Sequence, residues 1–326
     1  MLAWEKAPYL ASVEVAATRA RIASRIVGRE WELELILAAV TAGRDMLLEG
    51  PPGTSKSTLL RAITAEWDIP LIFVEGNADL TPAKLIGHHT PARVLREDYS
   101  ADNFVDGPLL EAMRQGGFLY IEEFNRAPED TVNTLLTAMA EREVAVPRVG
   151  RVMAQPTFRI IATMNPFDNV GTTRLSTSVY DRLCRLAVTY QDGEAERGIV
   201  SLRASLPLEF INSELLAGLI ADAVAVTRAT RHHPDVHQGS SVRGAIDLTL
   251  VAGSLFDMRG IRELGDPLRR DHSEQQAYTD TVYDAMVVAL SGRIHLDETT
   301  ESTPEEVLRQ IWEDHFVLNP ATAAPG

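Results

Sequence analysis

The residues from 50 to 57 have the types and spacing needed to bind a phosphate group. They are Gly50, Pro51, Pro52, Gly53, Thr54, Ser55, Lys56 and Ser57. Glycines and a rigid Pro-Pro bend let successive backbone N–H groups point at an anion, and the helical pattern that follows adds its positive dipole end. Lys56 can reach the outer phosphates and the Ser57 hydroxyl can bind Mg²⁺. We add Thr58 to this nucleotide-binding set; a glycine usually precedes the lysine, and the Cβ of Ser55 narrows that space.

Two carboxylates follow an apolar run at Phe118 to Ile121, and their place suits the chemistry of the same phosphate. Ligands of open parallel sheets bind beyond the carboxyl ends of the strands, so this strand end is expected beside the loop. Glu122 can hold Mg²⁺, and Glu123 can orient and deprotonate a water that attacks the γ-phosphate. Glu122 stands where an aspartate is usual, and its extra methylene can move the metal. Such a pair taken alone is most often a solvated strand end.

Three further polar residues are candidates for contacts with the reacting phosphate. Asn165 follows the apolar run at 159–163 and would stand between the water and the γ-phosphate, although an asparagine before a proline also commonly opens a turn. Arg182 precedes another apolar run, and Arg243 opens a helical pattern late in the chain. Each arginine can neutralise charge in the transition state, whereas an isolated arginine is more often part of a surface ion pair.

Short apolar runs alternate with helical patterns, which predicts an α/β fold with a five-stranded parallel sheet covered by helices. The expected strands are 45–48, 71–74, 118–122, 159–163 and 183–188. From about residue 206 the pattern is helical without strand-like runs. We therefore expect an α/β domain at 1–205, a smaller all-helical lid at 206–292, and an acidic C-terminal helix and tail at 293–326.

The composition limits the partners and the compartment. The 46 acidic and 31 basic side chains give a net charge of -15, which repels nucleic acid backbones. The most apolar stretch, 215–226, is too short for a membrane helix. The N-terminus lacks the apolar run of a secretory signal, and the single cysteine, Cys184, cannot form an internal disulfide and is expected to be buried. These features predict a cytoplasmic protein.

Taken together, the motifs resemble those of AAA+ ATPases, and more specifically of the MoxR family, over residues 26–250. The matching segments, in family order, are 26–30, 50–57, 79–82, 85–87, 106–109, 122–128, 138–142, 162–166 and 181–182.

The resemblance implies a P-loop NTPase αβα sandwich with a helical lid, using ATP and Mg²⁺. It implies that Val27 and Gly28 join the nucleotide site, that Glu123 is the catalytic base, and that Asn165 is sensor one. Arg182 corresponds to the arginine finger of a neighbouring subunit, and Arg243 to sensor two. The segments 88–103 and 144–154 correspond to inserts that face the ring surface or pore.

The resemblance also implies a homo-oligomer, a hexameric ring that serves a client protein, commonly with a partner carrying a von Willebrand factor A domain. Three functions stay open at this point. The first is a chaperone that couples ATP hydrolysis to remodelling or activating a client. The second is a nucleotide-dependent scaffold with weak hydrolysis, because of Ser55 and Glu122. The third is a DNA-translocating ring, for which Arg148 and Arg151 could line the pore, although the acidic charge opposes it.

Overall fold

The computed structural model describes residues 12–89, 101–166, 175–206, 213–261 and 271–318. The chain forms two units, Met1–Thr189 and Tyr190–Gly326. This division lies earlier than the expected boundary at 205–206, because helix α9 (Gly193–Arg203) contributes Val200 to the apolar core of the second unit.

A five-stranded parallel sheet forms the centre of the first unit and confirms the predicted fold class. Its strands are β1 (Met46–Glu49), β2 (Leu71–Glu75), β5 (Phe118–Glu122), β8 (Arg159–Met164) and β9 (Cys184–Ala187). They lie in the order β2-β5-β8-β1-β9. The inner strands β1 and β8 are buried along their whole length, as expected of near-continuous apolar runs in a sheet covered on both faces.

The edge strand β9 corrects one expectation. Cys184 is exposed, although its place in an apolar run predicted burial. The strand has β1 as a neighbour on one side, and Arg185 beside Cys184 is exposed as well. Strand periodicity does not reveal whether a strand lies at the edge or the centre, so the sequence pattern misled the burial prediction.

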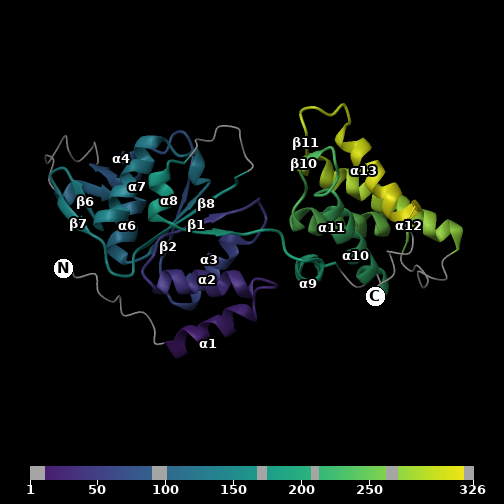
Figure 1. The fold of residues 1–326 in the computed structure, drawn as a ribbon. Coiled ribbons are helices and arrows are strands. Elements are labelled where there is room, and N and C mark those ends of the chain that lie inside the picture. The colour runs from purple at the N-terminus through teal and green to yellow at the C-terminus, as the bar shows by residue number, and fades with distance from the viewer. Residues whose placement is uncertain (1–11, 90–100, 167–174, 207–212, 262–270, 319–326) are drawn as a thin grey trace. The chain divides into compact units, whose positions relative to one another are not determined.

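Helices cover both faces of the sheet (Figure 1). On one face lie α1 (Ser12–Ala23), α2 (Glu30–Thr41) and α3 (Lys56–Glu66). On the other lie α4 (Pro82–Ile86), α6 (Pro108–Gln115), α7 (Glu129–Glu141) and α8 (Thr177–Arg182). Each face has its own apolar core, so the sheet is the middle layer of a three-layer sandwich.

Smaller elements extend from the layers of the first unit. Strands β3 (Gly87–His89) and β4 (Phe104–Asp106) pair antiparallel, with a 3₁₀ turn at Ala101–Asn103; residues 90–100 of the expected insert lie outside the described residues. A second 3₁₀ turn spans Phe124–Arg126. Strands β6 (Glu143–Val146) and β7 (Gly150–Met153) form the hairpin expected near 144–154, with Arg148 in the turn at φ 65°.

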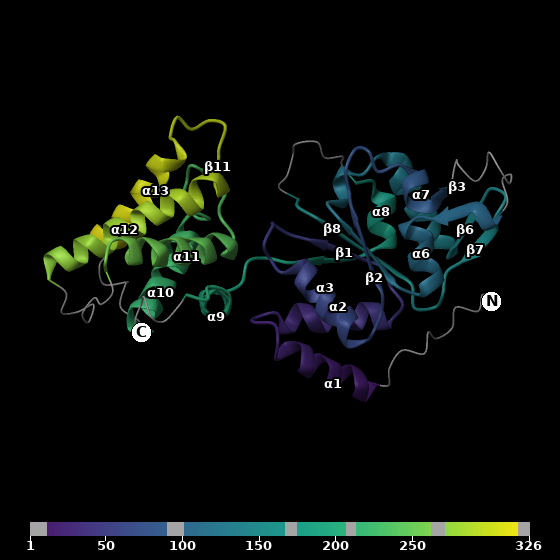
Figure 2. The same ribbon diagram turned by 180° about the vertical axis from the view of Figure 1, so that it is seen from behind.

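The second unit is mainly helical (Figure 2). Its elements after α9 are α10 (Ser213–Ala229), β10 (Val236–Gln238), α11 (Val242–Met258), α12 (His272–Leu290), a 3₁₀ turn (Ser291–Arg293), β11 (His295–Leu296), α13 (Pro304–Glu313) and a π-helical turn (Asp314–Leu318). The antiparallel pair β10–β11 corrects the expectation of an all-helical lid, because strands this short give no periodic signal.

Helix α13 packs into the core of the second unit and does not form a separate tail. Val307, Leu308 and Ile311 are buried there, and a capping box at Thr303 and Glu306 starts the helix. Residues 319–326 of the expected tail lie outside the described residues. None of the helices described has both the length and the apolar character needed to cross a membrane.

A buried carboxylate, Asp45, anchors the amino end of β1. This is the end of the strand remote from the phosphate-binding segment. Asp45 is 3% exposed; it accepts a hydrogen bond from the guanidinium of Arg142 (2.7 Å) and another from the Ile160 amide (2.7 Å). Burial raises the pKa of the Asp45 carboxyl, and the Arg142 charge acts in the opposite direction. These bonds join the end of α7 to the first residues of β1 and β8.

We expect Asp45→Ala to lower the free energy of unfolding of the first unit by about 2 kcal/mol, because the Ile160 amide would be left buried without a partner. Urea denaturation measures the effect. The control is Glu143→Ala, which breaks the ion pair with Arg151, a side chain 74% exposed. That change should cost about 1 kcal/mol or less. Equal losses in the two variants would contradict the anchoring role of Asp45.

Candidate active site

The parallel register brings the predicted catalytic segments to one edge of the sheet. Glu49 pairs with Met164 and Ile121 with Ala162, so β1, β5 and β8 end side by side. The loop at 50–57, the carboxylates at 122–123 and Asn165 are the next residues along these three strands or their last. The structure therefore brings together three segments that lie far apart in the sequence.

Gly50 fixes where the loop leaves the sheet. Its amide donates to the Met164 carbonyl (3.1 Å), so the loop begins against the end of β8. A Cβ at this position would stand 2.0 Å from the Val188 carbonyl oxygen, just beyond β9. The close approach of two backbones on either side leaves room for glycine alone.

The remainder of the loop has the curvature of a phosphate cradle. Gly53 has φ 75° and Ser55 has φ 67°, both left-handed, and α3 starts at Lys56 directly after Ser55. The Thr54 hydroxyl is buried and donates to the Pro51 carbonyl (2.9 Å), which closes the turn from inside. Ser55 thus adopts the conformation that glycine would take most readily, and the departure from the usual motif leaves the turn intact.

Lys56 is held within the loop by backbone carbonyls. Its ammonium donates to the carbonyls of Gly50 (2.7 Å) and Pro51 (2.9 Å). Ser57 and Thr58 lie in the first turn of α3, where the unpaired amides of a helix N-terminus attract anions. Ser57 is half-buried and Thr58 is exposed. The loop therefore presents a cation and a helix start at the same place.

The two glutamates at the end of β5 face different surroundings. Glu122 accepts a hydrogen bond from the Tyr120 phenol (3.2 Å). Glu123 has φ 53°, which turns its side chain out of the strand, and it pairs with Arg126 (3.2 Å). The turn is close to Gly76 beyond β2, where a Cβ would stand 2.3 Å from the Glu123 carbonyl oxygen. The backbone thus gives the two adjacent carboxylates different partners.

Asn165 is connected to this carboxylate turn. The buried Asn125 side chain donates to the Asn165 carbonyl (3.4 Å), which joins the segment after β8 to the segment after β5. This contact therefore holds the turn that carries Glu123 next to the segment that carries Asn165.

Val27 and Gly28 lie in the turn between α1 and α2. Gly28 has φ 64°, and the next residue, Arg29, is 2% exposed. Arg29 pairs with Glu32 and donates to the Thr189 carbonyl (2.7 Å), the residue that ends the first unit. Because Thr189 follows the last residues of β9, this contact ties the turn to the carboxyl end of the sheet.

The two predicted arginines lie in different units. Arg182 is exposed at the end of α8, and its guanidinium donates to the Ser178 carbonyl of the same helix (3.1 Å). Arg243 lies in the first turn of α11 in the second unit. Their roles toward the phosphate stay predictions.

A buried network supports the turn before Arg243. Ser240, 1% exposed, donates its amide to the Thr230 hydroxyl (2.9 Å) and accepts from the guanidinium of Arg231 (2.7 Å). Arg231 in turn pairs with the buried Glu196 (2.8 Å). The start of α11 is therefore fixed to α9 and to the end of α10.

The donor set at the loop fits Mg²⁺. Ser57 offers a hydroxyl and Glu122 a carboxylate, and Mg²⁺ binds such hard oxygen ligands together with substrate phosphates and water. Ser57 lies in the first turn of α3 and Glu122 ends β5, where its carboxylate accepts from the Tyr120 phenol (3.2 Å). No other cofactor chemistry is required by these residues.

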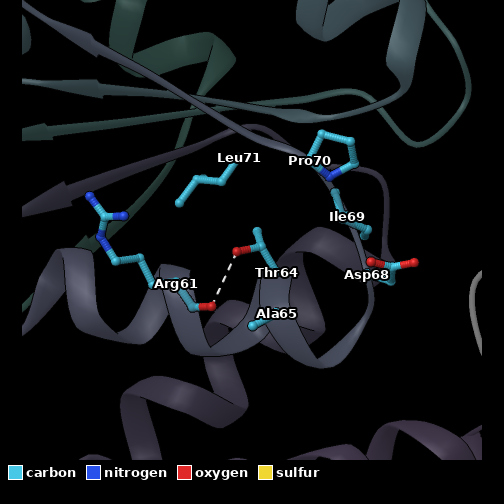
Figure 3. A pocket seen from close by; sticks show the side chains of 7 residues that line it. All are labelled: Arg61, Thr64, Ala65, Asp68, Ile69, Pro70 and Leu71. Carbon is cyan, nitrogen blue, oxygen red and sulfur yellow. Dashed lines mark hydrogen bonds between the residues drawn. The ribbon is translucent and has the colours of Figure 1, made fainter.

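A shallow surface hollow lies elsewhere, where α3 ends and β2 begins (Figure 3). Its lining residues are Arg61, Thr64, Ala65, Asp68, Ile69, Pro70 and Leu71. The Thr64 hydroxyl donates to the Arg61 carbonyl (3.2 Å), a bond internal to the helix. The hollow is at the end of α3 remote from Lys56 and includes none of the predicted site residues.

Comparisons with known proteins agree with this arrangement. Residues 45–183 match the family model of an AAA domain of the dynein-related subfamily. The gas vesicle ATPase GvpN of Ancylobacter aquaticus is 29% identical over 266 residues, covering 74% of this chain and 71% of the relative. An uncharacterised protein of Staphylococcus epidermidis is 27% identical over 241 residues, covering 73% of this chain and 89% of the relative. The family match and the ATPase relative confirm the family resemblance drawn from the motifs.

One solved structure illustrates the likeness to proteins of known structure. It is NtrX from Brucella abortus in complex with ADP, which is 21% identical, with a TM-score of 0.49, covering 74% of this chain and 54% of that chain.

Motif matching did not single out three residues that support the site. Tyr120 is buried and donates to Glu122, Arg29 donates to the Thr189 carbonyl, and Gly76 admits the Glu123 turn. The sequence does contain a signal for Tyr120 and for Gly76. A tyrosine within an otherwise aliphatic strand, and a glycine directly after a strand, each indicate a special contact.

The left-handed conformation of Ser55 leads to a stability test. We expect Ser55→Gly to raise the free energy of unfolding by up to about 1 kcal/mol, since relief of backbone strain exceeds the added entropy of the unfolded chain. Ser55→Val should lower it by about 1 kcal/mol or more, because a β-branched residue fits this conformation poorly. Urea denaturation without nucleotide measures both, with Thr58→Val on the exposed side of α3 as control. A Val variant as stable as the parent would contradict the strain.

Proposed function

We propose that this chain, whose residues 45–183 match an AAA domain, is an AAA+ ATPase that hydrolyses ATP to remodel or activate a client protein. The observation that carries the proposal is the convergence of Lys56, Glu123 and Asn165 at the carboxyl edge of one parallel sheet. A phosphate cradle, a base and a polar sensor are the parts that ATP hydrolysis needs.

Each residue has a defined task in the proposed reaction. The backbone amides of Gly53, Thr54 and Ser55 and the side chain of Lys56 bind the phosphates, and Ser57 with Glu122 would hold Mg²⁺. The metal supplies positive charge that stabilises the transition state when it is bound. Glu123 accepts a proton from the attacking water. Because Glu123 pairs with Arg126 in this structure (3.2 Å), the carboxylate has to exchange that partner for the water.

The proposal includes assembly into a homo-oligomeric, hexameric ring. Arg182 is exposed at the end of α8, where it is available to a neighbouring subunit, and Arg243 serves its own nucleotide from the second unit. We infer a protein client, with a von Willebrand factor A domain protein as an accompanying partner. GvpN, one of the relatives, is named for gas vesicles, which fits an ATPase that serves a protein assembly.

The structure gives less support to the other two functions. A scaffold with weak hydrolysis is suggested by Ser55 and Glu122, but Ser55 adopts the left-handed conformation that a glycine would take at this place in the loop. A DNA-translocating ring requires basic pore residues, yet Arg151 on the hairpin pairs with Glu143 (3.0 Å), which cancels its charge locally. The client-remodelling function is therefore the one we carry forward.

Removal of the proposed base tests hydrolysis. We expect Glu123→Gln to keep ATP binding and to lower turnover by about 10²- to 10⁴-fold, because general-base catalysis is lost. Phosphate release and ATP calorimetry measure the two effects. Glu129→Gln makes the same chemical change on an exposed residue at the start of α7 and should leave turnover unchanged.

The same variant tests the client. We expect the Glu123→Gln variant to keep the client protein bound in the presence of ATP. The Lys56→Ala variant, which lacks the phosphate contact, should release the client. Turnover unchanged in Glu123→Gln would reject the assignment of the base.

Co-expression of two inactive variants tests the role of Arg182 across a subunit boundary. We expect Arg182→Ala alone to lower turnover by about 10³-fold, as for an arginine finger. A complex that mixes Arg182→Ala with Glu123→Gln subunits should regain about a quarter of the parent rate, because half of the sites keep Glu123 and half of those face an intact Arg182. Mixed complexes that stay inactive would show that Arg182 does not act on a neighbour's site.

A further inference from the structure

A buried arginine at the start of α2 joins two segments that lie far apart in the sequence. Arg29 is 2% exposed and directly precedes the first residue of α2. Its guanidinium pairs with Glu32 in the first turn of that helix, and its Nη2 donates to the Thr189 carbonyl (2.7 Å). One side chain therefore fixes the start of α2 against the chain just after β9.

The chain just after β9 also borders the start of the phosphate-binding loop. The Val188 amide donates to the Glu49 carbonyl (2.7 Å), and a Cβ on Gly50 would stand 2.0 Å from the Val188 carbonyl oxygen. Val188 and the residue after it therefore lie between the loop and the Arg29 guanidinium. Through these two consecutive residues, the turn that precedes α2 is joined to the loop.

This turn is held on both of its sides. Ile26 is buried in the apolar core that α1, α2 and α3 share with the sheet, and Arg29 is held by its two partners. Gly28, between them, has φ 64°, a left-handed conformation that favours glycine. Val27 and Gly28 are half-buried, so each keeps some surface that a ligand can contact.

Stability alone does not explain a buried guanidinium at this position. Arg29 Nε is buried and has no hydrogen-bond partner in the part of the chain that the structure describes. A buried donor without a partner costs free energy, and apolar side chains can often replace buried ion pairs without loss of stability. The arginine is therefore better explained by what its two bonds hold in place.

A nucleotide bound at the loop needs contacts beyond the loop. In the proposed function the phosphates lie against residues 53–56, so the ribose and the base extend past them. Sites for such groups are surfaces that exist before the ligand binds. A surface that is already fixed adds affinity, because less conformational entropy is lost on binding. The turn at Val27 and Gly28 is a surface of this kind, joined to the start of the loop.

We propose that Arg29 is a positioning residue for nucleotide binding, which holds the Val27–Gly28 turn where it contacts the ribose and base of ATP. Its guanidinium acts through the Thr189 carbonyl and Glu32 and touches neither the phosphates nor the metal. The proposal rests on the proposed function, since it assumes that the phosphates of a nucleotide bind at the loop.

The test compares a ligand that has a nucleoside with one that lacks it, in the full-length protein. ADP affinity is measured by calorimetry, and the affinity for inorganic pyrophosphate is measured by competition with ADP, both with Mg²⁺. We expect Arg29→Met to weaken ADP binding by about 10-fold or more, because both bonds of a buried charged donor are lost. Pyrophosphate affinity should stay within about 2-fold, because the loop keeps its own contacts.

The matched control makes the same change at another buried arginine of the first unit. Arg159 is 3% exposed and donates to the Pro156 carbonyl (2.8 Å) at the amino end of β8, the end of the strand remote from the loop. Arg159→Met should leave ADP affinity within about 2-fold of the parent. Equal losses of ADP affinity in the two variants would show a general effect of losing a buried arginine and would overturn the proposal.

The remaining outcomes separate this inference from the proposed function. If the parent protein binds neither ADP nor pyrophosphate, the proposed function fails. If the parent binds both and Arg29→Met binds ADP equally well, the positioning role alone is overturned. The positioning role is also overturned if Arg29→Met weakens ADP and pyrophosphate by the same factor, because Arg29 would then act on the loop.

A second variant keeps the test decisive if Arg29→Met does not fold, which urea denaturation reveals. Arg29→Lys keeps the positive charge beside Glu32, but a compact ammonium does not reproduce the planar fork that reaches two separate oxygens. We expect ADP binding to be weaker than in the parent by about 3-fold or more, with pyrophosphate affinity again within about 2-fold. A folded Arg29→Lys protein with the ADP affinity of the parent would contradict the positioning role.

Discussion

The position of Gly50 between two strand ends is the constraint on which the rest of the site depends. Its amide is bonded to the Met164 carbonyl, and its α-carbon passes so close to Val188 that a Cβ would stand 2.0 Å from the carbonyl oxygen. The loop therefore leaves the sheet at a fixed point and in a fixed direction. Because β8 ends at the same contact, the segment with Asn165 is placed relative to the loop by the same bond.

Two residues with side chains adopt left-handed backbone conformations at this edge. Ser55 closes the loop before α3, and Glu123 turns out of β5. Such conformations cost free energy and persist where the surroundings determine them. Here the rigid parallel strands on either side supply that restraint, so the strained backbone brings the proposed phosphate-binding loop and a carboxylate to the same end of the sheet.

Buried arginines hold the chain on both sides of the connection between the units. Arg29 in the first unit donates to the Thr189 carbonyl. In the second unit, the guanidinium of Arg231 lies 3.9 Å from the ring centroid of Tyr190 and pairs with Glu196. Arg29 follows the proposed nucleotide residues, and Arg231 supports the turn before Arg243. Each side of the connection is thus linked, within its own unit, to a segment proposed to contact the nucleotide.

The sequence by itself determined the five parallel strands, the phosphate-binding loop and the pair of glutamates, because these features depend on local patterns. Apolar runs specify buried strands, and glycine, proline and lysine at fixed spacing specify the loop. Only the tertiary structure decided that β9 lies at the edge with Cys184 exposed, and that the chain divides at residue 189. It also decided that the Tyr120 phenol donates to Glu122. These features depend on contacts between segments distant in sequence, which residue type and spacing do not encode.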